Sequence, residues 1–388
     1  MLSLLKNKKF RDAGFQIAFV GFLVLIVVTF ILTARSNLAA QGITSGFGFL
    51  DRATGWDINF SLLSYKTSDP YSRAILIGFL NSMFVGAISL TLATLIGIAV
   101  GVMRTSGNGM AELIGTTYVE IFRNVPLLLQ LFFWYALLTA LPKPKQATAI
   151  FDSIFLTGRG VYFPGLNISA KMVFFSIVTM IIAGSFVLWL KTARRFTRMP
   201  ALQKINFKRM IWGAGLVVVL ILMVVGRIPG TSLVNIPYLK GLNYRGGIRL
   251  SPELLACIVA ISIYGASYIA EIVRAGFNSV DSGQGEAAHA LGLSRWHAFS
   301  RIILPLAIRA VMPTMINQYV WLLKATTIGI AIGFVDFFMV ISTSINQSGQ
   351  TLELIGILMG GFLAVNYAMA WVLNRVNDAI KLKGTQVR

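Results

Sequence analysis

The chain has few of the residues that hold metals, disulfides or nucleotides. Its 388 residues include one cysteine, two histidines and 14 acidic side chains. A single cysteine cannot form a disulfide framework, and Cys257 lies in an apolar run, which predicts inert packing. No Gly-x4-Gly-Lys-Ser/Thr phosphate loop is present, nor any Gly-Lys dipeptide, so the chain does not hydrolyse ATP by that route. The Gly-x-Ser-x-Gly nucleophile motif is missing as well, which argues against an enzyme.

Charge is scarce too, at 12% of residues, whereas a soluble domain carries roughly a quarter. Hydrophobic residues make up 56% and the mean hydropathy is +0.74. Several apolar runs reach the ~20 residues that cross ~30 Å of hydrocarbon, so we predict an all-α polytopic membrane protein. The net charge of +20 does not indicate nucleic acid, because no basic residues alternate with stacking aromatics. The positive-inside rule explains it more simply.

We predict about eight transmembrane helices. They are Phe15–Thr33, Ala74–Met103, Phe122–Leu141, Met172–Leu190, Met210–Val225, Pro252–Val273, Val311–Phe334 and Leu352–Leu373. An even number places both termini on one side, and basic residues in both tails and in Lys191–Arg209 favour the cytoplasm. The first run could instead be a signal peptide cleaved after Leu38-Ala39-Ala40, but its apolar core exceeds a typical signal core and favours an uncleaved anchor.

Small residues are spaced for close helix packing in two of these runs. The pairs are Gly97-xxx-Gly101, Ser82-xxx-Gly86 and Gly356-xxx-Gly360, and such spacing lets helix backbones approach one another. Two outer segments, Arg35–Arg73 and Pro142–Lys171, are predicted to be loops with short interfacial helices and no catalytic group.

A polar, basic segment, Glu286–Pro305, stands between two apolar runs and contains both histidines. Gly292 can end a first helix in the left-handed conformation. Ser294 can cap a second helix, Arg295–Ile303, that Pro305 limits or kinks. A polar hairpin of this kind could simply be a solvated cytoplasmic connection, with the histidines as surface residues.

The amino-acid sequence of the segment resembles the EAA motif of ABC-importer permeases. The pattern is Glu-Ala-Ala, three residues, Gly, nine residues, then Ile-x-Leu-Pro, matched at Glu286, Ala287, Ala288, Gly292, Ile302, Leu304 and Pro305. The resemblance implies that this loop, with Ser294 as a helix cap, is the coupling helix seated in a separate ATPase subunit. The alanines would let the helix seat deeply, and Glu286 would supply an anionic contact.

Three further segments resemble the polar amino-acid permeases, and within them the general L-amino-acid transporters of the AapQ/BztB type. They are residues 118–133, 268–277 and 322–327. The resemblance covers 74–141 and 251–380 as the permease core, with the coupling loop at 276–309. The chain departs from the compact five-span form by an N-terminal anchor and outer segment (1–73) and by an inserted two-span segment (142–250). A cytoplasmic tail, 381–388, ends it.

The resemblance implies a transport subunit without ATPase activity of its own in the bacterial inner membrane. It would import amino acids, broad-range polar L-amino acids, by alternating access. The partners implied are a dimer of ATPase subunits that binds ATP and Mg, a second and related permease, a periplasmic amino-acid-binding protein and membrane lipid, with no nucleic acid. The alternative is an ion-gradient-driven secondary transporter.

A zwitterionic substrate needs an acceptor for its ammonium and donors for its carboxylate, and ionisable groups inside spans are functional candidates. Glu271 is the candidate acceptor, with Ser267 among the small residues beside it. Its alternative role is an ion pair with Arg274 at i+3. Lys324, Thr326 and Thr327 are candidate donors from the following span, whereas Arg123 and Asn124 are expected to fix the helix start before Pro126.

Overall fold

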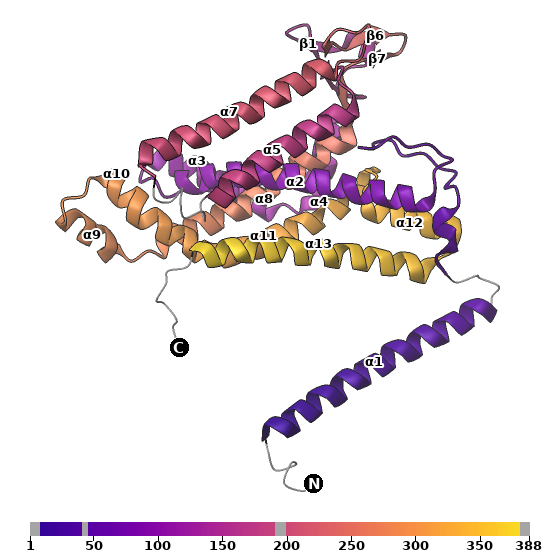
Figure 1. Ribbon diagram of the computed structural model, residues 1–388, viewed down its shortest axis with the longest axis horizontal. Helices are drawn as coiled ribbons and strands as arrows, with labels where there is room; N and C mark the ends of the chain where they lie inside the picture. Colours follow the sequence, from indigo (N-terminus) through magenta and orange to yellow (C-terminus); the bar gives the residue numbers. More distant parts are fainter. Residues whose placement is uncertain (1–7, 41–45, 191–198, 381–388) are drawn as a thin grey trace. The chain divides into compact units, whose positions relative to one another are not determined.

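The computed structural model describes residues 8–40, 46–190 and 199–380, and the tail 381–388 lies outside them. The chain forms two compact units: residues 1–134 with 253–388, and residues 135–252 (Figure 1). The first unit is helical. Its elements are α1 (Lys8–Ala40), η1 (Phe47–Asp51), α2 (Tyr71–Met103), α3 (Gly109–Asn124), α4 (Leu127–Thr139), α8 (Pro252–Asn278), α9 (Ser282–Ala290), α10 (Arg295–Ala298), η3 (Phe299–Ile303), α11 (Leu304–Lys324), η4 (Ala325–Ile332), α12 (Phe337–Ser348) and α13 (Thr351–Ile380).

The described helices confirm the membrane class but not a count of eight. Six helices are long and apolar enough to cross a bilayer, or up to seven if one bent pair counts as a span, and Lys171–Val187 is a shorter apolar helix. The bent pair is the predicted span Phe122–Leu141, which is wrong as a single helix. It is instead α3 and α4 at 101° to each other.

Pro126 explains the bend. The residue before a proline is pushed out of the helical region, and Val125 accordingly lies at ψ 124. The amide nitrogen of the buried Gln130 donates to the carbonyls of Phe122 and Val125, at 2.8 and 2.9 Å. The corner is therefore a fixed feature rather than a flexible kink.

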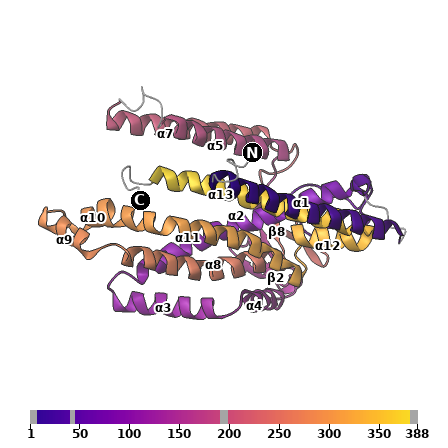
Figure 2. The same cartoon turned by 90° about the horizontal axis from the view of Figure 1, so that it is seen from below.

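The glycines of α2 let α8 approach closely. A Cβ on Gly97 would lie 2.6 Å from the Cβ of Ile269, and a Cβ on Gly101 would lie 2.7 Å from that of Val273. The prediction from the Gly97-xxx-Gly101 spacing is confirmed. In Figure 2, α8 and α11 run alongside each other.

The other two small-residue pairs differ in outcome. Ser82 Oγ accepts a hydrogen bond from the backbone of Phe337 at 2.9 Å, and a Cβ on Gly86 would meet Leu323, so this pair is also a close approach. Gly356 and Gly360 have no neighbour within 4 Å among the described residues. That pair does not pack helices within the described part of the chain.

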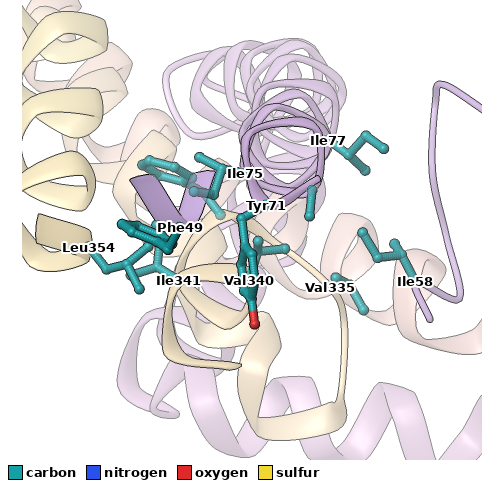
Figure 3. Close-up of a cluster of buried hydrophobic side chains, with 11 residues drawn as sticks. Phe49, Ile58, Tyr71, Ile75, Ile77, Val335, Val340, Ile341 and Leu354 are labelled. Carbon is teal, nitrogen blue, oxygen red and sulfur yellow. The ribbon is translucent and has the colours of Figure 1, made fainter. Parts of the chain in front are cut away.

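A buried apolar cluster joins η1, α2, α12 and α13. Figure 3 shows its side chains, including Phe49, Tyr71, Val340 and Leu354, directed toward one another. The N-terminus of α12 is held at this cluster by Asp336, whose carboxylate accepts from the backbone of Met339 at 2.8 Å. Asp336 is fully buried, and its Oδ2 has no hydrogen-bond partner among the described residues. Burial raises the pKa of Asp336 from 3.8 to about 7.

We expect Asp336 to make stability depend on pH. Because its folded pKa lies above its unfolded pKa, the folded state binds the proton more tightly. The contribution of Asp336 to stability is therefore greatest below about pH 4 and falls as pH rises toward about 7, by up to ~1.4 kcal/mol per unit. Asp336→Asn keeps a capping side chain but cannot titrate. Thermal unfolding in detergent between pH 5 and 8 should show a flatter profile for this variant than for the wild type, and parallel profiles would contradict the assignment.

The second unit combines two helices with short strands. The helices α5 (Ala170–Leu190) and α7 (Ala201–Val225) pack on each other, with Gly215 against Ala183. One antiparallel sheet has the order β1-β2-β3-β8, and the pairs β4-β5 and β6-β7 complete the unit. The strands are β1 (Thr148–Ile150), β2 (Ile154–Thr157), β3 (Gly160–Phe163), β4 (Gly165–Leu166), β5 (Val234–Asn235), β6 (Tyr238–Lys240), β7 (Asn243–Arg245) and β8 (Ile248–Leu250).

The predicted interfacial helices in Pro142–Lys171 are wrong, apart from one short turn, η2 (Pro144–Gln146). The segment forms four strands instead, because β-branched and aromatic residues alternate with tight glycine turns. Gly158 and Arg159 connect β2 to β3 as a two-residue hairpin. Gly241 after β6 and Gly246 after β7 take positive φ values of 69° and 79°, which glycine adopts without strain. These turn residues were the sequence signal for a sheet.

Candidate functional site

The polar segment 286–305 folds as a protrusion between two membrane helices. It follows α8 and leads into α11 (Figures 1 and 2). Asp281 caps α9, accepting from the backbone of Gly283 at 2.7 Å. Ala288 is the buried residue of α9, while Glu286, Ala287 and His289 are exposed. The helix therefore buries one alanine and exposes the carboxylate of Glu286 to solvent.

Gly292 makes the turn that the sequence predicts. Its φ is +75, a left-handed conformation that costs other residues free energy. The amide of Gly292 donates to His289 at 2.9 Å and the amide of Leu293 donates to Ala288 at 3.1 Å, which closes the end of α9. The turn therefore separates α9 from α10.

The second predicted helix differs from the structure at its end. Ser294 caps α10 and accepts from the backbone of His297, as predicted. Pro305 does not terminate the helix, because α10 continues through η3 into α11 without a break. The reason is that η3 is a π-helical turn, which widens the helix and accommodates the missing N–H and the ring of Pro305.

The base of the protrusion is held by aromatic stacking. The ring of Phe299 stacks on Phe277 of α8 at 5.8 Å and on Trp296 at 6.0 Å between centroids. Ile302, Leu304 and Pro305 are half-buried on the same stretch. The base of the protrusion is thereby attached to α8 by the contact of Phe299 with Phe277, and η3 continues directly into α11.

Two apolar side chains on the protrusion were missed by the sequence argument. Leu291 is 79% exposed and Trp296 is 70% exposed. Large apolar groups exposed together outside a membrane helix indicate a surface that another protein covers. The sequence does not single them out, because the same segment also contains Leu293, Phe299 and Ile302.

The candidate substrate residue Glu271 lies at the centre of an arginine cluster. Its Oε2 accepts from Arg104 Nη1 of the α2 end at 2.6 Å, and its Oε1 accepts from Arg274 Nη2 at 2.5 Å. Arg123 of α3 lies 3.9 Å from the same carboxylate. The ion pair with Arg274, the alternative from the sequence, is present. Arg104 and Arg123 were not connected to Glu271 by any sequence signal.

Three guanidinium groups around one carboxylate leave an excess of positive charge. Such a site attracts an anionic group more readily than an ammonium. Glu271 also borders a hollow of about 330 Å³ between α8 and α11, lined by Gly276, Val311 and Thr314. Whether Glu271 contacts a substrate stays a prediction.

An aromatic surface adjoins this cluster. Tyr264 and Tyr268 of α8 lie 5.7 and 6.4 Å from the ring of Trp321, and Arg123 sits 5.6 Å from the centre of the Tyr268 ring. Tyr118 of α3 donates to the carbonyl of Ile263 at 2.8 Å. These aromatic side chains thus connect α3, α8 and α11.

The remaining candidate donors are less clearly placed for a ligand. Ser267 and Thr326 are fully buried and donate to the backbone carbonyls of Tyr264 and Leu323, three residues earlier in the chain. Thr327 donates in the same way to Lys324, whose side chain is exposed. The structure therefore does not gather these four side chains with Glu271 in one hydrogen-bonded site among the described residues.

Comparison with known proteins gives a consistent set of relatives. Residues 210–380 match the family described as binding-protein-dependent transport system inner membrane component. The permease protein YhdX of Escherichia coli strain K12, named for amino-acid ABC transport, is 36% identical over 97% of this chain and 95% of its own. The general L-amino acid permease AapQ of Rhizobium johnstonii is 34% identical over 98% and 94%. The glutamate/glutamine/aspartate/asparagine permease BztB of Rhodobacter capsulatus is 30% identical over 98% and 96%.

Proposed function

Since the chain belongs to the family of amino-acid ABC transporter permeases, the inner membrane components of binding-protein-dependent transport systems, we propose that it forms the translocation path of an amino-acid importer. Relatives named for general L-amino acids and for four acidic and amide amino acids support a broad range of polar L-amino acids as substrates. Transport would proceed into the cytoplasm by alternating access, with Glu271, Ser267, Lys324, Thr326 and Thr327 as the proposed substrate path.

The observation that carries the proposal is the protrusion of α9 and α10. It has the EAA spacing, a left-handed Gly292, an exposed Glu286 and two exposed apolar side chains, Leu291 and Trp296. A chain without a phosphate loop has to take its energy from elsewhere. We therefore assign this protrusion as the contact with a separate ATPase, whose dimer binds ATP and Mg²⁺. The exposed leucine and tryptophan would enter an apolar cleft of that subunit.

The remaining partners follow from this assignment. A second, related permease chain would complete the path, a periplasmic binding protein would deliver the amino acid, and lipid would cover the apolar helices. Both termini would lie in the cytoplasm of a bacterium, with the protein spanning its inner membrane. An ion-gradient-driven transporter is the competing function, and it would show uptake that persists without ATP.

We expect Gly292→Pro to abolish ATP-driven uptake by an assembled complex. Proline is fixed near φ −65° and has no N–H, whereas Gly292 has φ +75 and donates to His289. The turn would open and move Leu291 and Trp296 away from the ATPase. The measurement is amino-acid uptake and ATP hydrolysis by proteoliposomes that contain this chain, a second permease and the ATPase subunit. Coupled uptake should drop by about a hundredfold, as expected when a positioning element is lost.

Gly109→Pro is the matched control. Gly109 is the first residue of α3 and follows Asn108, whose backbone is extended, so proline is compatible with this position, and no atom lies within 4 Å of its Cβ position. It should retain uptake near the wild-type rate. Wild-type uptake in the absence of ATP, or unaltered coupling by a folded Gly292→Pro complex, would reject the ATPase contact.

A further inference from the structure

The strands of the inserted segment carry a strong excess of positive charge. Residues 142–171 and 226–251, which include the strands of the segment and the first two residues of α5, contain one carboxylate, Asp152. The same residues contain eight basic side chains, all of them exposed: Lys143, Lys145, Arg159, Lys171, Arg227, Lys240, Arg245 and Arg249. We call this group the basic surface.

None of these eight cations forms an ion pair with a carboxylate among the described residues. Arg159 and Arg249 are held by backbone oxygen instead. Arg159 donates to the carbonyl of Leu242 at 3.0 Å, and the carbonyl of Arg159 accepts two hydrogen bonds from Arg249, at 3.1 and 2.9 Å. These bonds fix the two guanidinium groups but do not neutralise their positive charge.

A hollow opens on the basic surface within the same unit. It has a volume of about 750 Å³ and is lined by Lys143, Lys145 and Arg159, together with Pro144 and Leu242. Beside it the sheet is rigid. Tyr162 is buried and donates to Asn243 at 2.9 Å, and Tyr244 stacks on Phe155 at 4.4 Å between centroids. The hollow is a preformed, cationic concavity with no acidic residue in its lining.

Helix α8 indicates on which side of the membrane the basic surface lies. Strand β8 ends immediately before α8, and α9 follows the other end of α8. The 27 residues of α8 span about 40 Å, the thickness of a bilayer. If α9 contacts an ATPase in the cytoplasm, the basic surface faces outward. Outer segments are ordinarily poor in Lys and Arg, so targeting does not explain this charge.

We propose that the basic surface is the docking site of the extracytoplasmic binding protein, through an acidic patch on that protein centred on the hollow. The proposal rests on the function proposed above and assigns a role to the inserted segment. A binding protein is part of the transport systems to which this family belongs. Complementary charge raises the association rate and orients the partner. Unpaired cations gathered around a concavity beside folded strands suit a shaped protein surface better than a fluid layer of lipid headgroups.

The test measures docking by its effect on ATP hydrolysis. The complete complex is reconstituted in liposomes of phosphatidylcholine alone. The binding protein used is the periplasmic protein that stimulates ATP hydrolysis by this complex when it is added together with glutamate. The variant is Lys143→Glu with Lys145→Glu. We expect the binding-protein concentration for half-maximal stimulation to rise by about tenfold or more, since like charges would now face the acidic patch. The maximal rate and the unstimulated rate should stay at wild-type values. Raising the salt concentration from about 50 to 500 mM should reduce the difference in this half-maximal concentration between the wild type and the double variant.

Lys66→Glu is the matched control, because Lys66 is an exposed lysine of the other outer segment and forms no ion pair among the described residues. It should behave as wild type. An unchanged half-maximal concentration in the double variant would overturn the proposal. A shift that appears only in liposomes containing anionic lipid would overturn it as well and assign the surface to the membrane. Failure of the proposed function would look different, since the wild-type complex would then show no stimulated hydrolysis at all.

Discussion

Gly97→Val is expected to destabilise the folded permease strongly. A Cβ at this position would lie 2.6 Å from the Cβ of Ile269 and 2.9 Å from the backbone oxygen of Ala266. Neither contact can be relieved by turning a flexible side-chain end, because one involves a β-branched residue at its first carbon and the other involves backbone. Helices α2 and α8 would have to separate.

The expected cost is about 3 kcal/mol or more, at the upper end of the range for overpacked cores. Separation of the two helices would also weaken the ion cluster at the end of α2, where Arg104 contacts Glu271. The measurement is the thermal unfolding temperature in mild detergent, with size-exclusion chromatography to detect aggregation. We expect a decrease of roughly 5–10 °C or the loss of the monodisperse peak.

The control for this variant is Gly213→Val in α7. Gly213 is also a helical glycine in an apolar run, and no atom lies within 4 Å of its Cβ position. This substitution should change the unfolding temperature little. Equal stability of the Gly97 and Gly213 variants would contradict the close approach of α2 to α8.

Glu271→Gln is expected to have the second-largest effect. The substitution should lower the stability of the folded protein rather than act directly on transport. The side chain of Arg104 is only 8% exposed and its guanidinium is paired with Glu271. Removing one partner of a buried ion pair leaves an uncompensated charge. Because Glu271 itself is 26% exposed, the expected loss is about 2–3 kcal/mol, below the full range for buried pairs.

The double variant Glu271→Gln with Arg104→Met separates this explanation from a substrate contact. Replacing both charges of a buried pair is often close to neutral, so the double variant should recover most of the lost stability. Glu120→Gln, at an exposed residue of α3, is the control for neutralising a glutamate. If Glu271→Gln unfolds like the wild type but raises the substrate concentration for half-maximal uptake, Glu271 binds the ammonium of the substrate and the ion-cluster explanation fails.

The helical elements were largely predictable because membrane insertion imposes a simple rule. An apolar run of about 20 residues has to satisfy its backbone internally, and a helix is the way one segment can do so. Each of the eight predicted runs is helical over most of its described residues. The exception was local: Pro126 divides one run into α3 and α4, and the carbonyls freed at the corner are bonded by Gln130, a residue whose role no periodicity indicates.

The protrusion was predictable because its determinants are close in sequence. Asp281, Gly292 and Ser294 act through hydrogen bonds and dihedral angles within four residues. The arginine cluster was not predictable, because Arg104 and Glu271 are separated by 167 residues and meet only through the packing of α2 on α8. The basic surface also depends on tertiary structure, since Arg159, in the turn between β2 and β3, precedes α5 and α7 in the sequence, whereas Arg249, in β8, follows them.

The sequence alone therefore determined the class of protein, the polar protrusion between two spans and the glycine turn that shapes it, because composition and short-range geometry are sufficient for each. Tertiary structure decided which charges meet. Lys143, Lys145 and Arg159 line one hollow only after the sheet has formed, and Glu271 is paired only after α2 and α8 have packed. Electrostatic energy depends on distances in space, and the order of residues along the chain does not give those distances.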